Sequence, residues 1–371
     1  MPHFHPFELE HYQSLYEHTV DVNLADSSVK CTDVGSWLTA AERDALLSVS
    51  LLYPEVNGLS RMREKIASHH DDTTPDEVLV TTGAAQANHL VASTLLGPGD
   101  GVVWFSPGYR QLPGLALNLG CRVHDVPLDP EDNWSVDWDR FDAAMGEGVR
   151  LVAVVNPNNP TGRILERSEM ERIVAACERV GAWLHADEVY HGTELDGADT
   201  PSFRGMYDKV VVTNSLSKAY GLAGLRIGWA IASPNVIQDL WRRHEYEVIA
   251  AAAPSMFLGD LALSHEKRVA LLDRQRGISR VGHDTLTEWL AEQDGLFSVA
   301  RRQATSIGFV RYHVDAPSLE VAERIRKEAS VLTAPGVFLG AEGHLRITVG
   351  YEPEKIRPAL DRIADVVRGM A

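Results

Sequence analysis

Short apolar runs alternate with helical patterns through the middle of the chain, between Val78 and about Pro234. Such nearly continuous apolar runs are typical of strands that are buried on both faces of a sheet. Between them lie amphipathic stretches, including residues 110–119 and 167–179. Strand and helix in alternation predict an α/β fold with a doubly wound, mostly parallel sheet. The expected strands are 78–82, 101–105, 151–155, 182–186 and 209–213.

The pattern changes after about Ala262. A long charged helix is expected over 266–292, followed by two strand-like runs, 306–312 and 344–349, with a helical stretch at 318–329 between them and a helix from Pro353 onward. This is a smaller α+β domain, and 371 residues exceed the usual size of one compact domain. We expect residues 1–44 to be an N-terminal segment of the small domain, 45–261 the large domain and 262–371 the small C-terminal domain.

Charge and cysteine content exclude several classes of function. A net charge of −17 opposes binding to nucleic acid or to an anionic membrane. Cys31, Cys121 and Cys177 are too scattered for a disulfide framework or a zinc site, and we expect no metal. The first residues lack the pattern of a signal peptide, and no apolar run is long enough to span a membrane. The sequence therefore predicts a cytoplasmic protein.

A turn that follows the last of these strands carries reactive groups. It runs Ser215-Leu216-Ser217-Lys218-Ala219-Tyr220-Gly221-Leu222-Ala223-Gly224-Leu225-Arg226. A lysine amine can form a Schiff base with an aldehyde, while hydroxyls and a guanidinium can hold a phosphate dianion. The turn thus suits an aldehyde cofactor that carries a phosphate.

Other candidate residues stand at the carboxyl ends of expected strands, where open α/β sheets bind ligands. Asp187 ends one strand, and Asn159 follows another in a turn rich in Asn, Pro and Gly. The turn Thr82-Gly83-Ala84-Ala85-Gln86 opens a helix and could hold an anion with its backbone N–H groups. Each has an ordinary alternative: a capping or surface aspartate, a plain turn, or a βα connection.

Three of these motifs, in this order and spacing, resemble the class I/II (fold type I) pyridoxal-phosphate aminotransferases: 156–162, Asp187-Glu188-Val189-Tyr190 and 215–226. The resemblance spans roughly Leu51 to Gly350. It implies pyridoxal 5'-phosphate as cofactor and the fold type I sheet of about seven strands. It implies that the phosphate is held by the turn at Gly83, Ala84 and Ala85, with Gln86 a weaker candidate, and by Ser215, Ser217 and Arg226.

The same resemblance implies roles around the cofactor ring. Lys218, Asp187 and Tyr190 would be catalytic: Lys218 binds the cofactor aldehyde and moves the substrate proton, Asp187 faces the ring nitrogen, and Tyr190 and Asn159 donate to the phenolic oxygen. Tyr109 matches the aromatic residue that stacks on the ring, with core packing as its alternative.

Substrate and subunit contacts follow from two further positions. Arg346 falls at the place of the family's carboxylate-binding arginine, with Asn159 beside the substrate, and strand alternation puts Arg346 on the face opposite Leu345 and Ile347. A solvated strand arginine is the alternative. Tyr53 matches the tyrosine that reaches the phosphate bound by the other subunit, which implies a homodimer with shared active sites.

The implied reaction is transfer of the amino group of an L-amino acid to a keto acid. The segment 242–255 departs from the serine- and threonine-rich stretch of many aminotransferases and looks more like the capreomycidine synthase-like subset. A β-elimination or β-replacement lyase, or a cyclase, is therefore the alternative. A non-catalytic ligand sensor of the kind found in transcription regulators is disfavoured, because the N-terminal segment leaves no room for a winged helix.

Residues 29–38 and 244–253, with the partner subunit, are where we expect side-chain selectivity to arise. No second arginine can be assigned to a substrate's distal carboxylate. His244, Glu245 and Glu247 could recognise a basic or polar side chain, although a solvated helix face explains them more simply.

Overall fold

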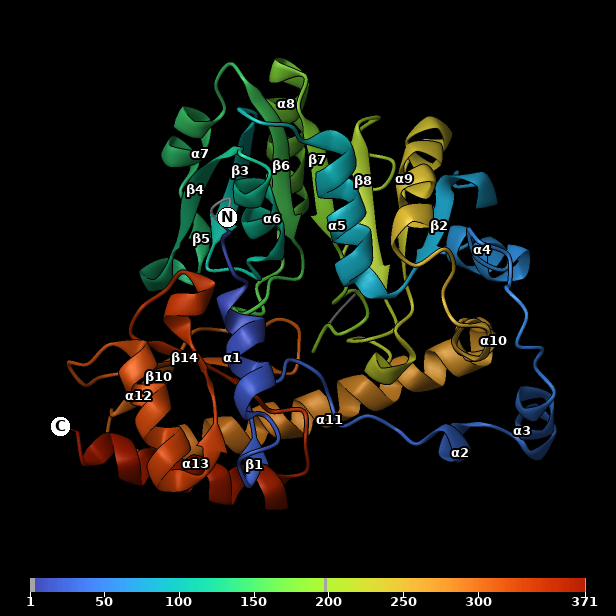
Figure 1. Ribbon diagram of the computed structural model, residues 1–371. Coiled ribbons are helices and arrows are strands. Elements are labelled where there is room, and N and C mark those ends of the chain that lie inside the picture. Colours follow the sequence, from blue (N-terminus) through green and yellow to red (C-terminus); the bar gives the residue numbers. More distant parts are fainter. Residues whose placement is uncertain (1–3, 197–198, 371) are drawn as a thin grey trace.

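The alternating apolar runs form one large sheet. The computed structural model describes residues 4–196 and 199–370. Within these ranges the large sheet has eight strands in the order β2-β9-β8-β7-β6-β3-β4-β5 (Figure 1). They are β2 (Val78–Thr81), β3 (Gly101–Ser106), β4 (Arg122–Asp129), β5 (Ser135–Val136), β6 (Val149–Val155), β7 (Trp183–Asp187), β8 (Val210–Ser215) and β9 (Gly228–Ile231).

Most neighbours in this sheet are parallel. The strands from β8 through β7, β6 and β3 to β4 all run in one direction. Strand β9 runs antiparallel between β2 and β8, and the two-residue β5 is antiparallel at the far edge. The fold is thus the predicted doubly wound, mostly parallel sheet, with seven longer strands and the short β5 added at the edge.

Helices cover both faces of the large sheet, because successive side chains of each buried strand point to opposite faces. In β3, Val102 and Trp104 belong to one apolar core and Val103 and Phe105 to the other. The first core includes α5 (Gly83–Leu95), α6 (Gln111–Asn118) and α9 (Pro234–Glu247). The second includes α4 (Ser60–Ala67), α7 (Trp138–Ala144), α8 (Arg167–Val180) and α10 (Ala253–Ala262).

A smaller domain is built on an antiparallel sheet. Its four strands among the described residues have the order β10-β11-β14-β13. They are β10 (Phe297–Val299), β11 (Ile307–Tyr312), β14 (His344–Thr348) and β13 (Ala334–Pro335), and they pack with α11 (His265–Ala291), α12 (Ser318–Arg324), a π-helical turn (Ile325–Ala329) and α13 (Pro353–Arg368). Figure 1 shows the long helix α11 running below the large sheet toward α13. The α+β character predicted for this region is confirmed.

The N-terminal segment links the two sheets. Helix α1 (Glu8–Tyr16) lies between them in Figure 1, and β1 (Val22–Asn23) pairs in parallel with β12 (Val331–Leu332) of the small domain. Two short helices, α2 (Val34–Trp37) and α3 (Ala40–Leu47), lead from there to α4. The domain boundaries at 44/45 and 261/262 stay predictions.

Most of the predicted elements appear close to their expected positions. Each of the five predicted strands has a counterpart whose ends differ by at most two residues, and the charged helix expected at 266–292 is α11. Short 3-10 turns lie at Pro75–Glu77, Pro130–Asp132, Ala223–Leu225 and Gly336–Leu339. In the part of the chain that the structure describes, no helix combines the length and the apolar character that crossing a bilayer requires.

Candidate active site

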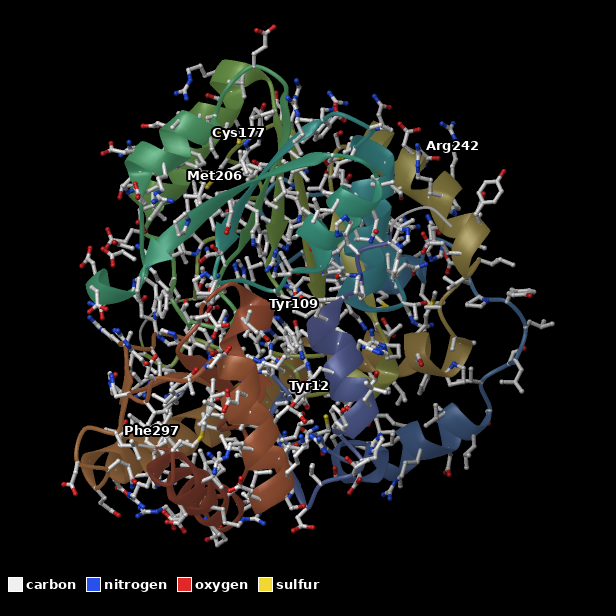
Figure 2. The ribbon with its side chains drawn as sticks, turned by 60° about the vertical axis from the view of Figure 1, so that its left-hand side comes forward. Tyr12, Tyr109, Cys177, Met206, Arg242 and Phe297 are labelled. Atoms are coloured by element: carbon white, nitrogen blue, oxygen red, sulfur yellow. The ribbon has the colours of Figure 1, made fainter. Side chains whose placement is uncertain are left out.

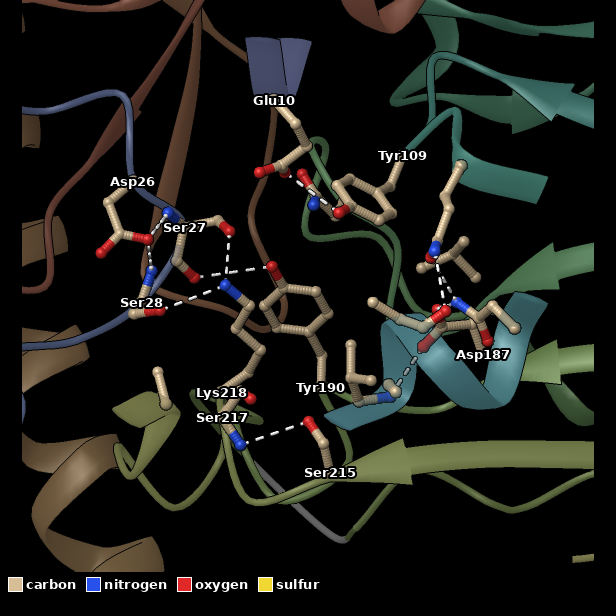
Figure 3. A pocket seen from close by; sticks show the side chains of 18 of the residues that line it. Glu10, Asp26, Ser27, Ser28, Tyr109, Asp187, Tyr190, Ser215, Ser217 and Lys218 are labelled. Carbon is tan, nitrogen blue, oxygen red and sulfur yellow. Dashed lines mark hydrogen bonds between the residues drawn. The ribbon is translucent and has the colours of Figure 1, made fainter. Parts of the chain in front are cut away.

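One cavity of about 440 Å³ collects most of the residues singled out in the sequence (Figure 3). It lies at the carboxyl ends of β6, β7 and β8, the edge at which open α/β sheets bind ligands. The predicted site residues that line it are Ala84, Ala85, Tyr109, Asn159, Asp187, Tyr190, Ser215, Ser217, Lys218 and Arg226. Gly83, Arg346 and Tyr53 are not part of this lining.

Lys218 projects into the cavity from the turn that follows β8. Its Nζ donates to Ser27 Oγ at 2.8 Å and to Ser28 Oγ at 3.1 Å, and both serines are buried (Figure 3). These hydroxyls come from the N-terminal segment, whereas the lysine comes from the large sheet. The amine is therefore held where residues from distant parts of the sequence meet.

Asp187 is the last residue of β7 and is buried, as its place at the end of an apolar strand predicted. Its Oδ2 accepts from Asn88 Nδ2 at 2.9 Å, and its Oδ1 accepts from the backbone N–H of Val189 at 3.2 Å. Burial raises the pKa of Asp187 to about 6, although both hydrogen bonds act to lower it. A positive charge placed next to this carboxyl group would therefore stabilise its ionised form.

A neutral histidine, His185, belongs to the hydrogen-bond network around Asn88, the residue that donates to Asp187. Burial lowers the pKa of His185 to about 3, and its Nε2 lies 3.1 Å from Asn88 Oδ1 and 3.0 Å from Thr213 Oγ1. Thr213 also donates to Asn88 Oδ1 at 2.7 Å. This network orients the amide of Asn88 so that its N–H group faces Asp187.

Small residues and hydroxyls make a cradle at the start of α5. Ala84 and Ala85 lie in the first turn of that helix, whose free backbone N–H groups favour anions. Arg226 donates to Ser217 Oγ at 3.5 Å, and Ser215 Oγ accepts from the backbone N–H of Ser217 at 3.2 Å. A Cβ atom at Gly83 would lie 2.4 Å from Arg226 Nη2, so only glycine lets the guanidinium approach. The cradle fits a phosphate dianion.

Arg346 lies beside the cavity, on β14, and is 1% exposed. Its Nη1 donates to Asn159 Oδ1 at 3.2 Å and its Nη2 to the carbonyl oxygen of Ala25 at 2.6 Å, whereas its buried Nε has no partner among the described residues. Leu345 and Ile347 belong to the core of the small domain, on the opposite face of the strand, as predicted. The burial excludes the solvated strand arginine. The spare donor suits a carboxylate.

Two tyrosines flank the cavity. Tyr190 is buried, and burial raises the pKa of its hydroxyl, which donates at 3.5 Å to the carbonyl oxygen of Ser27. Tyr109 is half-buried, and its hydroxyl donates to Glu10 Oε1 at 3.0 Å. The side chain of Tyr109 therefore lines a cavity, which argues against simple core packing.

Several residues considered from the sequence lie elsewhere. Gln86 is not part of the cavity lining, because its side chain accepts from the backbone N–H of Thr82 and donates to Glu247. Tyr53 is 78% exposed on the surface of its own chain. Neither 29–38 nor 244–253, where side-chain selectivity was expected, contributes to the lining of the described cavity.

Sequence reasoning missed residues that other elements bring to the cavity. Phe7 and Glu10 come from the N-terminal segment, Asp26, Ser27 and Ser28 precede the stretch that was considered, and Asn88 lies on the cavity side of α5. His185 was recoverable, because two-residue alternation along β7 puts it on the same face as Asp187. The N-terminal residues carry no local signal that ties them to this site.

The described residues contain no group of three or more histidine, cysteine or acidic side chains arranged to hold a metal ion. The three cysteines are free thiols. The cavity lining offers hydroxyls, side-chain amides, the amine of Lys218, the guanidinium of Arg226, the buried carboxylate of Asp187 and the carboxylates of Glu10 and Asp26.

Comparison with known proteins identifies the family. Residues 21–363 match the model of the family described as aminotransferase class I and II. The arginine–pyruvate transaminase of Pseudomonas aeruginosa is 28% identical over 345 residues, 90% of this chain and 86% of that protein. Capreomycidine synthase of Streptomyces vinaceus is 28% identical over 308 residues, 82% of this chain and 77% of that protein.

A solved structure agrees with these sequence matches. A pyridoxal-phosphate-dependent aminotransferase from Streptococcus suis superimposes with a TM-score of 0.92 at 28% identity, covering 99% of both chains. The family match and the named aminotransferases favour transamination over the lyase or cyclase alternative. The chain belongs to the class I and II aminotransferase family and is a pyridoxal-phosphate-dependent aminotransferase.

Proposed function

We propose that this enzyme transfers the amino group of an L-amino acid, with Lys218 as the proton-transfer base and Arg346 as the carboxylate anchor. One observation carries the proposal: Lys218 and Arg226 of the turn after β8 and Asp187 at the end of β7 line one cavity, and Arg346 adjoins it through Asn159. An amine, an acid and two guanidinium groups are the set that this chemistry requires.

The residues present fit pyridoxal phosphate. The side-chain-free space at Gly83 lets Arg226 approach the start of α5, where Ala84, Ala85, Ser215 and Ser217 add donors for a phosphate. When bound, the cofactor supplies an aldehyde that captures amines and a ring that accepts electron density from the substrate α-carbon.

Four side chains would surround that ring. Asp187 would stabilise a protonated ring nitrogen and so favour the electron-accepting form. Tyr190 and Asn159 would donate hydrogen bonds to the phenolic oxygen. Tyr109 would stack against the ring face, a geometry that suits an aromatic side chain lining the same cavity.

Lys218 would remove and return the proton at the substrate α-carbon. A neutral amine is an effective base, and Ser27 and Ser28 provide hydroxyls that keep its Nζ in place. Arg346 would hold the substrate carboxylate through its spare donors, which fixes the orientation of the α-proton toward the lysine.

We propose a homodimer in which Tyr53 reaches the phosphate site of the partner subunit. The support is an exposed apolar surface formed by two segments, with a groove of about 280 Å³ between residues 51–54 and 250–254. Its large exposed side chains are Leu47, Leu51, Leu52, Tyr53, Tyr246, Val248 and Ile249. Large apolar side chains exposed along two segments that share one groove are suited to a second copy of this chain.

We propose a cytoplasmic location and a keto acid as the amino acceptor. The support is the net charge of −17, the free thiols and the reaction class. No contact with nucleic acid or membrane is proposed.

A single-turnover panel tests the proposed function. Holoenzyme is mixed with each amino acid without any keto acid, and cofactor absorbance and product mass are read together. Conversion to the aminated cofactor with one equivalent of keto acid supports the proposal and identifies the donor. Return of the starting spectrum with a dehydrated or cyclised product would refute it in favour of a lyase or cyclase.

A further inference from the structure

Two negative charges of the cavity have no counterpart once the proposed roles are assigned. In these roles Arg226 would hold the phosphate, Asp187 would face the ring nitrogen, and Arg346 would hold the substrate carboxylate. Glu10 and Asp26 are the acidic residues of the lining that remain.

Of these two, Glu10 is the one available to a substrate. Asp26 Oδ1 accepts from the backbone N–H groups of Ser27 at 2.6 Å and Ser28 at 3.1 Å, so it is engaged within its own turn (Figure 3). Glu10 accepts one hydrogen bond, from the neutral hydroxyl of Tyr109 at 3.0 Å, and forms no ion pair with any of the described residues. Glu10 is exposed at the edge of the cavity, and its charge faces solvent rather than a cation of the described residues.

Helix α1 is held in place over the cavity, which fixes the position of Glu10. The ring of Phe7 meets the ring of Tyr109 edge-on at 5.0 Å on the side of the large domain. On the other side, the hydroxyl of Tyr12 donates to Glu323 of α12 at 3.1 Å. Figure 2 shows Tyr109 near the upper end of α1 and Tyr12 on the helix itself. Phe7, which lines the cavity, adds an apolar surface next to the carboxylate.

Glu10 and the carboxylate anchor Arg346 both affect the pKa of Tyr109. The pKa of Tyr109 is raised well above its ordinary value, first by burial and then by the charge of Glu10, while Arg346 acts in the opposite direction. A negative group that contacts the Tyr109 hydroxyl and a positive group both influence this ring. An amino acid with a carboxylate at one end and a cation at the other matches this arrangement.

We propose that Glu10 selects substrates with a positively charged side chain, a guanidinium or an ammonium on an apolar stem. The carboxylate would pair with the cation, and Phe7 would pack against the stem. The proposal rests on the proposed function, since it takes Arg346 as the carboxylate anchor. It makes Glu10 a specificity-determining residue.

Binding of substrate analogues that lack the amino group tests this without turnover. The probes are 5-guanidinopentanoate, its neutral isostere 5-ureidopentanoate, and adipate, titrated into holoenzyme by calorimetry. The variants are Glu10→Gln, which keeps an acceptor for Tyr109 and removes only the charge, and Glu8→Gln, which changes an exposed acid of the same helix outside the cavity lining.

The expected result is that the guanidino acid binds at least about tenfold more tightly than the ureido acid. Glu10→Gln should bring the ratio of the two affinities close to one, while Glu8→Gln should leave it unchanged. Tighter binding of adipate, or an unchanged ratio in Glu10→Gln, would overturn the proposal. Half-reactions with amino acids distinguish a failure of this inference from a failure of the proposed function. Conversion of neutral but not cationic amino acids refutes this inference alone. Binding of the guanidino acid with no conversion of any amino acid refutes the proposed function alone.

Discussion

Lys218 Nζ donates to Ser27 Oγ at 2.8 Å across 191 positions of sequence. The large sheet supplies the lysine, and the N-terminal segment supplies the hydroxyl that holds it. The reactive amine is therefore sensitive to the placement of a segment that contributes nothing to the large sheet. This contact gives the N-terminal residues a direct part in the site.

Replacing Lys218 with alanine is expected to lower turnover by at least about a thousandfold, because both cofactor attachment and proton transfer lose their amine. Borohydride reduction followed by peptide mass spectrometry should find the cofactor on the peptide that contains Lys218 in the parent enzyme, and on no peptide in the variant. Lys209→Ala, an exposed lysine at the start of β8, is the control and should retain both properties. Attachment at another lysine of the parent enzyme would contradict the assignment.

Replacing Asp187 with asparagine is expected to separate stability from function. The pKa of Asp187 is raised from 3.8 to about 6 by burial, so its contribution to folding is full below pH 3.8 and is lost as the pH rises through 6. A difference of about two pKa units corresponds to about 3 kcal/mol as an upper limit. The cofactor-free variant should therefore resist urea better than the parent at pH 8, while its affinity for the cofactor falls.

The pH dependence provides the internal control for this prediction. Below pH 3.8 the carboxyl is mostly protonated in both the folded and the unfolded cofactor-free protein, and the two unfolding free energies should converge. Equal stability of variant and parent at pH 8, or tighter cofactor binding by the variant, would argue against a buried carboxylate that pairs with a positive ring nitrogen.

Replacing Arg346 with lysine is expected to raise KM for amino acids by at least about tenfold, because lysine keeps the charge but loses the fork that binds a carboxylate through two bonds. The decarboxylated amine of the same substrate should be affected far less. Steady-state kinetics on both compounds measures the difference. Arg311→Lys, an exposed arginine on the neighbouring strand β11, should leave the ratio unchanged. Equal losses for acid and amine would mean that Arg346 does not bind the carboxylate.

Mixing two inactive variants tests the shared active site. Tyr53→Ala lacks the residue proposed to reach the partner's phosphate, and Lys218→Ala lacks the base. If Tyr53 acts across the interface, mixed dimers contain one complete site, and random exchange should restore about one quarter of the parent activity. No recovery after verified subunit exchange would place Tyr53 outside the partner's site.

The sequence allowed the central strands and the residues at their ends to be predicted, because both depend on local patterns. Asp187 and Ser215 end buried apolar runs, and their exit at one edge of a parallel sheet brings them together. The strand β4 was missed because its residues are largely exposed or half-buried and give no strong periodic signal. The strand β9 was recoverable, because it lies in the buried apolar run 227–232 that follows the lysine turn.

The remaining site residues could not be predicted because tertiary packing alone brings them to the cavity. Glu10 and Ser27 belong to a segment with little periodicity, and their neighbours in space lie about 100 to 190 residues away. Asn88 lies inside a helix whose start was predicted, but its role depends on a hydrogen bond to Asp187 of β7, which local sequence does not indicate. A role for the exposed Tyr53 can likewise be tested only with a second chain in place, because its proposed contact lies in the partner subunit.

The parallel pairing of β1 with β12 has a consequence for how the protein is made. Val22 and Val331 are paired neighbours in the folded molecule, yet a ribosome releases one long before the other. The N-terminal segment that carries Glu10 and Ser27 therefore cannot make this pairing until residues 331–332 have been synthesised. We expect nascent chains to acquire the large sheet first and the ability to bind substrate last.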